Sequence, residues 1–214
     1  FVDAIKKTKN LIAMLRKQGI DIKYLDMGGG LGITYDKETP PHPSRYGKVV
    51  CDETKGLGLT LIFEPGRAMV GNAGILATKV LYTKQGTEKN FIIVDAAMND
   101  LARPSLYGSY HAIKPVTPPT PPFNKGGVGG VEIIADVVGP ICESGDFFAK
   151  DRELPVFKSG DLMAIMSAGA YGFSMSSNYN SRPRACEVMV NGNKFYIIRE
   201  RETYKDLVRG EDAR

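Results

Sequence analysis

Asp26-Met27-Gly28-Gly29-Gly30-Leu31-Gly32 is the stretch on which the fold prediction rests, because three consecutive glycines end a short apolar run there. The run itself, residues 22–27, is typical of a strand. A second such run, residues 59–63, ends at Glu64-Pro65-Gly66-Arg67. Residues 1–18 carry apolar side chains at helical spacing and predict an amphipathic helix. This alternation predicts parallel β/α units, in which ligand-binding groups lie on the loops that follow the strands.

The second part of the chain, from about residue 75, changes to strand-like runs separated by turn signals such as Asn191-Gly192-Asn193. We therefore predict an α/β part over residues 1–74 and a mainly antiparallel β-sandwich or barrel domain over residues 75–214. The polar end, residues 200–214, is expected to form a short surface helix or a frayed tail. The predicted strands of the β domain are residues 75–82, 91–94, 131–138, 161–166, 185–190 and 194–199.

Residues 117–130 differ from both parts, because they are rich first in proline and then in glycine. Such a composition does not form a regular β ladder. A ligand for an SH3-type domain and a flexible surface loop inserted between strands are the two interpretations. We favour the loop, because so simple a composition carries little information.

The overall composition is that of a soluble globular protein: 43% of the 214 residues are hydrophobic and 24% are charged, which is enough apolar material for a core. The net charge of +4 comes from scattered Lys and Arg, which argues against nucleic acid as a partner. No apolar run approaches the roughly 20 residues that span a bilayer, and no signal-peptide pattern opens the sequence. A cytoplasmic protein with no membrane partner is therefore expected. The aromatic residues expected to serve packing rather than function are Tyr179, Phe195 and Tyr196.

The cysteines and histidines predict neither a disulfide framework nor a metal site. Cys51, Cys142 and Cys186 are odd in number and widely spaced, and neither His42 nor His111 has a second ligand nearby. His42 is expected in an exposed proline-rich loop. Cys51 and Cys186 are expected to be small buried residues, whereas the polar residues that follow Cys142 argue against a core position for it.

The glycine loop has two interpretations. Consecutive glycines expose backbone amides with no Cβ in the way, as an anion-binding loop requires, but glycine runs also occur in plain turns. Glu64-Pro65-Gly66-Arg67 adds a carboxylate, an amide open to an anion and a permanent cation, although an ordinary surface turn has the same composition. A carboxylate that faces a pyridine nitrogen keeps it protonated and deepens the electron sink of pyridoxal phosphate.

Four motifs, in their order and spacing, resemble the diaminopimelate decarboxylases, and the resemblance runs through nearly the whole chain. It implies a fold-type III pyridoxal-phosphate enzyme, a homodimer built from an alanine-racemase-like (β/α)8 barrel and a C-terminal β domain. Residues 1–74 would then be the C-terminal portion of the barrel. Residues 102–107 and 139–146 favour diaminopimelate over the related ornithine and arginine decarboxylases. The four motifs are Asp26-Met27-Gly28-Gly29-Gly30-Leu31-Gly32, Glu64-Pro65-Gly66-Arg67, Cys142-Glu143-Ser144-Gly145-Asp146 and Ala170-Tyr171-Gly172.

The resemblance also implies roles for individual residues. Cys142 would be the general acid that returns a proton to the substrate carbon, and its loop would reach into the active site of the partner subunit. Glu143 would face the distal ammonium of the substrate. The residues that would bind the cofactor are Gly28, Gly29, Gly30, Glu64, Gly66, Arg67 and Tyr171, with Glu64 at the pyridine nitrogen. The residues that would contact the substrate are Arg67, Arg103, Tyr107, Glu143 and Tyr171.

Two features depart from the family pattern. The lysine that would bind the cofactor covalently is expected upstream of these residues, and Lys23 is in the wrong place for that role. The insert at residues 117–130 is the second departure. We therefore expect a fragment that is inactive alone. Its function would be decarboxylation of meso-2,6-diaminopimelate to L-lysine and carbon dioxide. The alternatives are a decarboxylase of arginine or ornithine, or a non-catalytic truncated dimerisation module.

Overall fold

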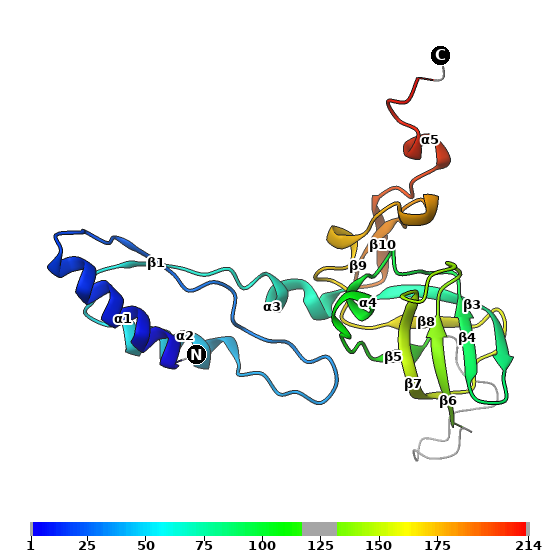
Figure 1. Cartoon of the computed structure of the whole chain (residues 1–214), viewed down its shortest axis with the longest axis horizontal. Coiled ribbons are helices and arrows are strands. Elements are labelled where there is room, and N and C mark those ends of the chain that lie inside the picture. The colour runs from blue at the N-terminus through cyan, green and yellow to red at the C-terminus, as the bar shows by residue number, and fades with distance from the viewer. Residues whose placement is uncertain (1, 117–131, 213–214) are drawn as a thin grey trace. The chain divides into compact units, whose positions relative to one another are not determined.

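The computed structural model describes residues 2–116 and 132–212, and the predicted insert at residues 117–130 lies outside these ranges. The chain divides into two compact units, residues 1–73 and residues 74–214 (Figure 1). Within the described ranges, no helix combines the length and the apolar character needed to cross a bilayer.

The first unit contains two main helices and a pair of short strands. Helix α1 (Val2–Lys17) buries Ile5 and Ile12 and contacts helix α2 (Pro43–Thr54), whose Val50 is also buried. Strands β1 (Tyr24–Asp26) and β2 (Thr60–Ile62) pair in parallel. The predicted helix and both predicted strands are therefore present, and each strand is shorter than the apolar run that contains it.

The sequence patterns do not predict helix α2, because the prolines before it favour a loop. Proline is in fact compatible with the first turn of a helix, where its missing N–H needs no partner. His42 is exposed, as predicted, but it has a structural role there: its Nδ1 accepts a hydrogen bond from the backbone N–H of Ser44 at 3.2 Å and so caps α2.

A six-stranded sheet forms the centre of the second unit. Its strand order is β5-β8-β3-β4-β6-β7, and every neighbouring pair is antiparallel except the parallel pair β4 and β6. The mainly antiparallel character is therefore as predicted. The strands are β3 (Leu76–Gln85), β4 (Asn90–Val94), β5 (Ile113–Pro115), β6 (Glu132–Val138), β7 (Phe147–Pro155) and β8 (Leu162–Ile165).

The core of the second unit forms where the apolar side chains of these strands meet, and Val80, Ile92, Phe148 and Ile165 are almost completely buried in it. The sequence patterns do not predict strand β7, because its apolar ends flank the charged run Lys150-Asp151-Arg152-Glu153, which is more typical of a loop. Pairing with β6 holds that charged run in a strand nonetheless. Strand β5 is also not predicted, because it is only three residues long and ends in proline.

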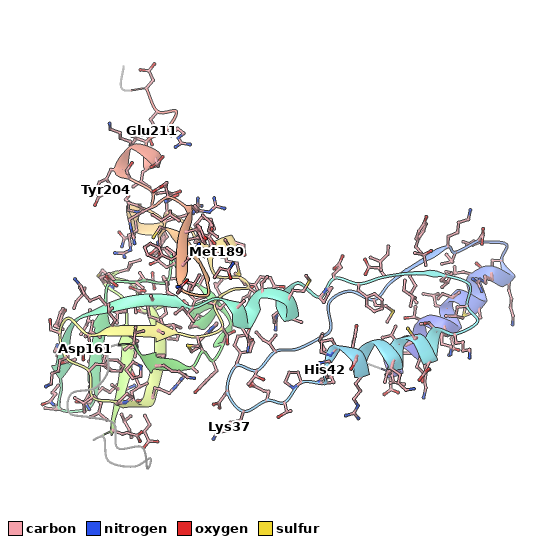
Figure 2. The ribbon with its side chains drawn as sticks, turned by 180° about the vertical axis from the view of Figure 1, so that it is seen from behind. Lys37, His42, Asp161, Met189, Tyr204 and Glu211 are labelled. Carbon is pink, nitrogen blue, oxygen red and sulfur yellow. The ribbon has the colours of Figure 1, made fainter. Side chains whose placement is uncertain are left out.

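The remaining elements are short; α3 and η1 belong to the first unit, and the others belong to the second. The hairpin of β9 and β10 exposes apolar side chains on both strands (Figure 2, in which Met189 is labelled). The expectation that Tyr179, Phe195 and Tyr196 serve packing is wrong among the described residues, since all three side chains are exposed. These elements are α3 (Gly66–Val70), η1 (Gly71–Ala73), α4 (Arg103–Tyr107), η2 (Phe173–Met175), η3 (Tyr179–Ser181), β9 (Glu187–Asn191), β10 (Lys194–Arg199) and α5 (Tyr204–Leu207).

The start of β3 yields a test of the fold. A Cβ added to Gly74 would lie 2.5 Å from the Cα of Gly169, a backbone atom that cannot rotate away. We expect Gly74→Ala to destabilise the protein that contains this chain by about 1–3 kcal/mol or more, measured by urea unfolding. Gly47→Ala is the matched control, because its Cβ would enter open space within α2; it should stabilise by up to about 1 kcal/mol. Equal effects of the two changes would contradict the packing described.

Candidate functional site

The glycine loop and the Glu64-Pro65-Gly66-Arg67 turn meet at the C-terminal ends of the paired strands β1 and β2. The two strands run parallel with Asp26 opposite Ile62, so both loops leave from the same end. The N–H of Met27 donates to the carbonyl of Ile62 at 2.9 Å, and the N–H of Glu64 donates to the carbonyl of Gly28 at 2.9 Å. Two motifs that are distant in the sequence are therefore directly hydrogen-bonded.

Glycine is required in this loop for two reasons. Gly28 and Gly30 have φ values of +64° and +66°, in the left-handed region that L side chains rarely adopt. A Cβ on Gly29 would lie 3.0 Å from the carbonyl oxygen of Glu64. The carboxylate of Asp26 fixes the start of the loop by accepting a hydrogen bond from the N–H of Gly28 at 2.8 Å.

The amides of the loop differ in what they can bind. The N–H of Gly28 is taken by Asp26, and the N–H of Gly66 donates to the carbonyl of Glu64 at 2.8 Å. Across residues 2–116 and 132–212, the N–H groups of Gly29 and Gly30 make no hydrogen bond. Adjacent amides of this kind form a concave donor site for an anion.

The side chains beside this loop add a carboxylate and a cation. Glu64 is exposed and Arg67 is half-buried at the start of α3. Tyr46 of α2 places its hydroxyl 3.5 Å from the carbonyl of Gly29, and its ring meets Phe63 edge-on with centroids 6.1 Å apart. Burial raises the pKa of Tyr46, so its hydroxyl stays protonated near neutral pH. No pattern in the sequence points to Tyr46, because it lies in the helix that the patterns do not predict.

In the second unit, Arg103 lies between two aromatic rings. Its side chain is buried, with the guanidinium carbon 5.8 Å from the ring centre of Tyr107 and 5.4 Å from that of Tyr171. One nitrogen, Nη2, donates to the hydroxyl of Ser109 at 3.2 Å. Tyr171 has a φ of +59°, a strained value for a bulky residue, and such strain clusters at functional sites. A positioned guanidinium beside two exposed tyrosines suits a carboxylate.

The loop that carries Cys142 joins β6 to β7 and is held by Asp146. The buried carboxylate of Asp146 accepts hydrogen bonds from the N–H groups of Met98 and Ile141, both at 2.7 Å. Burial raises the pKa of Asp146, and these two backbone bonds oppose the rise. Cys142 is exposed, as its polar neighbours predicted. The thiol therefore lies on a loop whose base is fixed.

The cysteine loop also lies against the segment that carries Arg103. A Cβ on Gly145 would lie only 2.7 Å from the hydroxyl of Ser105 in α4, so loop and helix are in close contact. The carboxylate of Glu143 accepts hydrogen bonds from the hydroxyl of Tyr179 at 3.3 Å and from the N–H of Gly145 at 3.2 Å. Within the second unit, the structure thus brings together the elements carrying the predicted residues. These are Arg103, Tyr107, Cys142, Glu143 and Tyr171.

Cys51, Cys186 and His111 lie outside the candidate site and have different surroundings. Cys51 is exposed and Cys186 is half-buried, so the expectation that both are buried was wrong. Cys51 lies on the surface of α2, and Cys186 lies directly before the start of β9. His111 is fully buried, which lowers its pKa, and its Nδ1 lies 2.8 Å from the carbonyl oxygen of Met166. No cluster of three or more potential metal ligands occurs in the described part of the chain.

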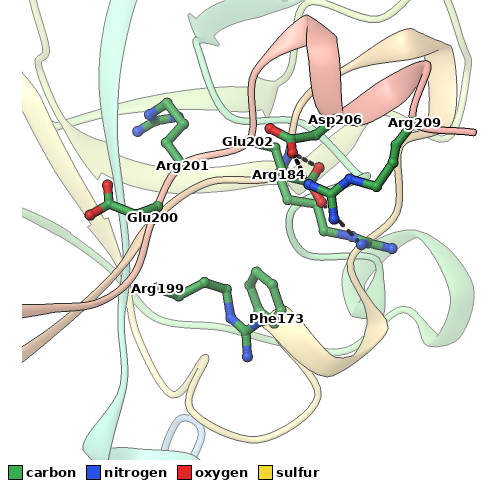
Figure 3. A pocket seen from close by; sticks show the side chains of 8 residues that line it. All are labelled: Phe173, Arg184, Arg199, Glu200, Arg201, Glu202, Asp206 and Arg209. Atoms are coloured by element: carbon green, nitrogen blue, oxygen red, sulfur yellow. Dashed lines mark hydrogen bonds and ion pairs between the residues drawn. The ribbon is translucent and has the colours of Figure 1, made fainter.

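A separate pocket of about 340 Å³ lies beside the end of β10 (Figure 3). Glu202 is one of its lining residues, and its carboxylate accepts hydrogen bonds from the side chain of Asn178 at 2.6 Å and from the backbone N–H of Arg184 at 2.8 Å. The hydrogen bond from the Arg184 backbone is the main reason why the pKa of Glu202 is lowered. Arg199 and Arg209 are also paired with carboxylates. The contacts of Glu202 with Asn178 and Arg184 therefore join the segment after β10 to residues 178–184.

Comparison with known proteins identifies the class to which this fold and site belong. The profile of the family described as "Pyridoxal-dependent decarboxylase, C-terminal sheet domain" matches residues 20–169. The chain therefore belongs to the pyridoxal-dependent decarboxylase family. The predicted architecture, the end of a (β/α)8 barrel followed by a mainly antiparallel β domain, is confirmed by its similarity to solved members.

The similarity within this family is to diaminopimelate decarboxylases. The chain is 50% identical over 208 residues to diaminopimelate decarboxylase of Vibrio cholerae, which covers 97% of this chain and 48% of that protein. The Helicobacter pylori enzyme complexed with L-lysine superposes with a TM-score of 0.84 at 43% identity, covering 97% of this chain and 49% of its own. The M. jannaschii enzyme in co-complex with L-lysine gives 0.87 at 34%, covering 100% and 48%. The chain thus spans about half the length of these relatives.

The cysteine loop yields a test of how the site is held. A Cβ on Gly139 would lie 2.3 Å from the carboxylate of Asp146, which is buried and fixed by its two backbone bonds. We expect Gly139→Ala to destabilise the protein by about 1–3 kcal/mol and to change the alkylation rate of Cys142, followed by peptide mass mapping. Ser144→Ala, an exposed change in the same loop, should stay within about 0.5 kcal/mol of the parent. A Gly139→Ala protein with parental stability and alkylation would show that Asp146 does not hold the loop.

Proposed function

We propose that this chain is part of a pyridoxal-phosphate-dependent decarboxylase that converts meso-2,6-diaminopimelate to L-lysine and carbon dioxide. The observation that carries the proposal is the meeting of the glycine loop with the Glu64 turn, which leaves two adjacent amides beside an exposed carboxylate. The similarity to diaminopimelate decarboxylases over 97% of the chain supports the same reaction.

The residues of the first unit fit pyridoxal phosphate. Its phosphate is an anion, and the N–H groups of Gly29 and Gly30 are the donors that suit it. The backbone at Gly66 is open, since a Cβ there would meet nothing within 4 Å. We assign the exposed carboxylate of Glu64 to the pyridine nitrogen, which it would keep protonated. When bound, the cofactor supplies a sink for the electrons of the broken bond between Cα and the carboxylate.

The remaining cofactor assignments, those of Arg67 and Tyr171, rest on the motifs of the sequence and on the family that they resemble. Arg67 lies directly after Gly66, and its amide is a further candidate for the phosphate. Tyr171, in the second unit, is assigned to the cofactor because the family resemblance implies it. The lysine that would bind the cofactor covalently is assigned to no residue of this chain, so a segment of the whole protein outside residues 1–214 would supply it.

The residues of the second unit fit a substrate with charged ends. Arg103, held between Tyr107 and Tyr171, would bind a carboxylate, where a charge-assisted hydrogen bond is worth about 1.5–3 kcal/mol. Glu143 would bind an ammonium group. Diaminopimelate carries two carboxylates and two ammonium groups, so its second carboxylate needs a cation such as Arg103. Arginine and ornithine have no second carboxylate, which is why we place them second.

Cys142 would act as the general acid. Its thiol would give its proton to Cα after carbon dioxide has left, and the thiolate would then recover a proton from solvent. Cys142 and Glu143 are both exposed on a loop with a fixed base, which suits a loop that reaches another surface. We infer that this surface is the active site of a second copy, so that the enzyme is a homodimer with shared sites. We place the enzyme in the cytoplasm, where free cysteines stay reduced.

A cysteine replacement in the full-length protein tests this function. We expect Cys142→Ser to lower kcat for carbon dioxide release from meso-diaminopimelate by about 10²–10⁴-fold, the usual contribution of a general acid. Cys51→Ser is the matched control, because Cys51 is also exposed but lies in α2, and it should leave kcat unchanged.

The same assay, run with arginine and ornithine, separates the alternatives. Faster turnover of either amino acid would replace the proposed substrate. Equal activity of the two cysteine variants would remove Cys142 from the mechanism. Absence of turnover with every substrate, in a full-length protein loaded with pyridoxal phosphate, would favour a non-catalytic role.

A further inference from the structure

Tyr179 makes a contact that its sequence position does not suggest. Its side chain is 48% exposed, so it does not serve the core of the described chain. Its hydroxyl donates a hydrogen bond to Oε2 of Glu143 at 3.3 Å, while the N–H of Gly145 donates to Oε1 of the same carboxylate at 3.2 Å. Each oxygen of Glu143 is thereby held by one donor. These two hydrogen bonds favour one orientation of the carboxylate.

The segment that carries Tyr179 is itself anchored to the core. The N–H of Tyr179 lies 3.3 Å from the hydroxyl oxygen of Ser177, and Ser177 exchanges backbone and side-chain hydrogen bonds with Asn99 at 3.0 and 3.2 Å. Asn99 is 2% exposed, and its side-chain oxygen accepts from Nε of Arg182 at 3.0 Å. The next residue, Asn180, has a φ of +57°, which completes a tight turn. These hydrogen bonds fix the backbone of the turn that carries Tyr179.

The hydroxyl of Tyr179 keeps its proton and so remains a hydrogen-bond donor to Glu143. The negative charge of Glu143, together with the hydrogen bond to it, raises the pKa of Tyr179. The hydroxyl therefore stays protonated at neutral pH. An ionised carboxylate has roughly four acceptor sites, of which the two described bonds use two. The carboxylate of Glu143 keeps capacity for an ammonium group while its orientation is set.

We propose that Tyr179 is a positioning residue that orients the Glu143 carboxylate toward the distal ammonium group of the substrate and so favours diamino acids over analogues lacking that group. The inference rests on the proposed function, because it needs Glu143 in contact with substrate. Tyr179 itself would touch neither the reacting carbon nor the cofactor. Its effect should appear in substrate binding and not in the chemical step.

Removal of one hydroxyl group tests this role in the full-length, cofactor-loaded protein. We expect Tyr179→Phe to raise KM for meso-diaminopimelate by about 2- to 12-fold, the range for one lost hydrogen bond, with kcat within about twofold. Tyr204→Phe, a 75% exposed tyrosine in α5, is the matched control and should leave both constants unchanged. KM for 2-aminopimelate, which lacks the distal ammonium, should be the same with and without Tyr179→Phe.

A double-mutant cycle separates positioning from general damage. In a Glu143→Gln background, Tyr179→Phe should raise KM no further, because the oriented charge is already gone. A fall in kcat without a rise in KM, an equal rise in KM for both substrates, or no change relative to Tyr204→Phe would each overturn the role of Tyr179. If the parent protein does not decarboxylate diaminopimelate at all, the proposed function fails first, and this inference falls with it.

Discussion

The hydrogen bond from the N–H of Glu64 to the carbonyl of Gly28 is the interaction on which the rest of the first unit depends. It follows from the parallel pairing of β1 and β2, because both loops then begin at the same end of the strand pair. Close approach of the two backbones then requires glycine at position 29, where a Cβ would lie 3.0 Å from a carbonyl oxygen. The same geometry leaves the N–H groups of Gly29 and Gly30 without a hydrogen bond within the described part of the chain. Structure and proposed chemistry therefore share one cause.

In the second unit, buried interactions restrict the positions of polar residues of the candidate site. Asp146 is buried at the base of the cysteine loop and accepts two short backbone hydrogen bonds, so the exposed residues before it lie on a fixed frame. Arg103 is fixed instead by the rings of Tyr107 and Tyr171. A buried charge costs free energy unless it is well paired, and in both cases the pairing also positions a candidate site residue.

Much of the fold could be predicted from local patterns. Apolar runs bounded by glycine or proline indicate most strands, and helical spacing indicates α1. Helix α2 and strand β7 could not be predicted in this way. In α2 the last of the prolines, Pro43, is the first residue of the helix and not part of a loop. In β7 four consecutive charged residues hide a strand that pairing with β6 stabilises. Both errors arise where tertiary context overrides composition.

The candidate site was predictable only in part, and for a related reason. Short contiguous motifs, which indicate their chemistry from the sequence alone, contain Cys142, Glu143 and the glycine loop. Tyr179 and Asp146 gain their importance from partners that lie up to 48 positions away in the chain, and no local pattern indicates such pairs. The expectation that Tyr179 packs was reasonable for an aromatic residue, yet its hydroxyl contacts a carboxylate.

Hydrogen exchange of the backbone amides, measured by mass spectrometry on the full-length protein with and without pyridoxal phosphate, tests the central claim most directly. We predict that a peptide spanning residues 26–32 exchanges more slowly when the cofactor is bound, because the N–H groups of Gly29 and Gly30 then donate to its phosphate. Unchanged exchange in this peptide, in protein that demonstrably holds the cofactor, would contradict the anion-binding role of the glycine loop.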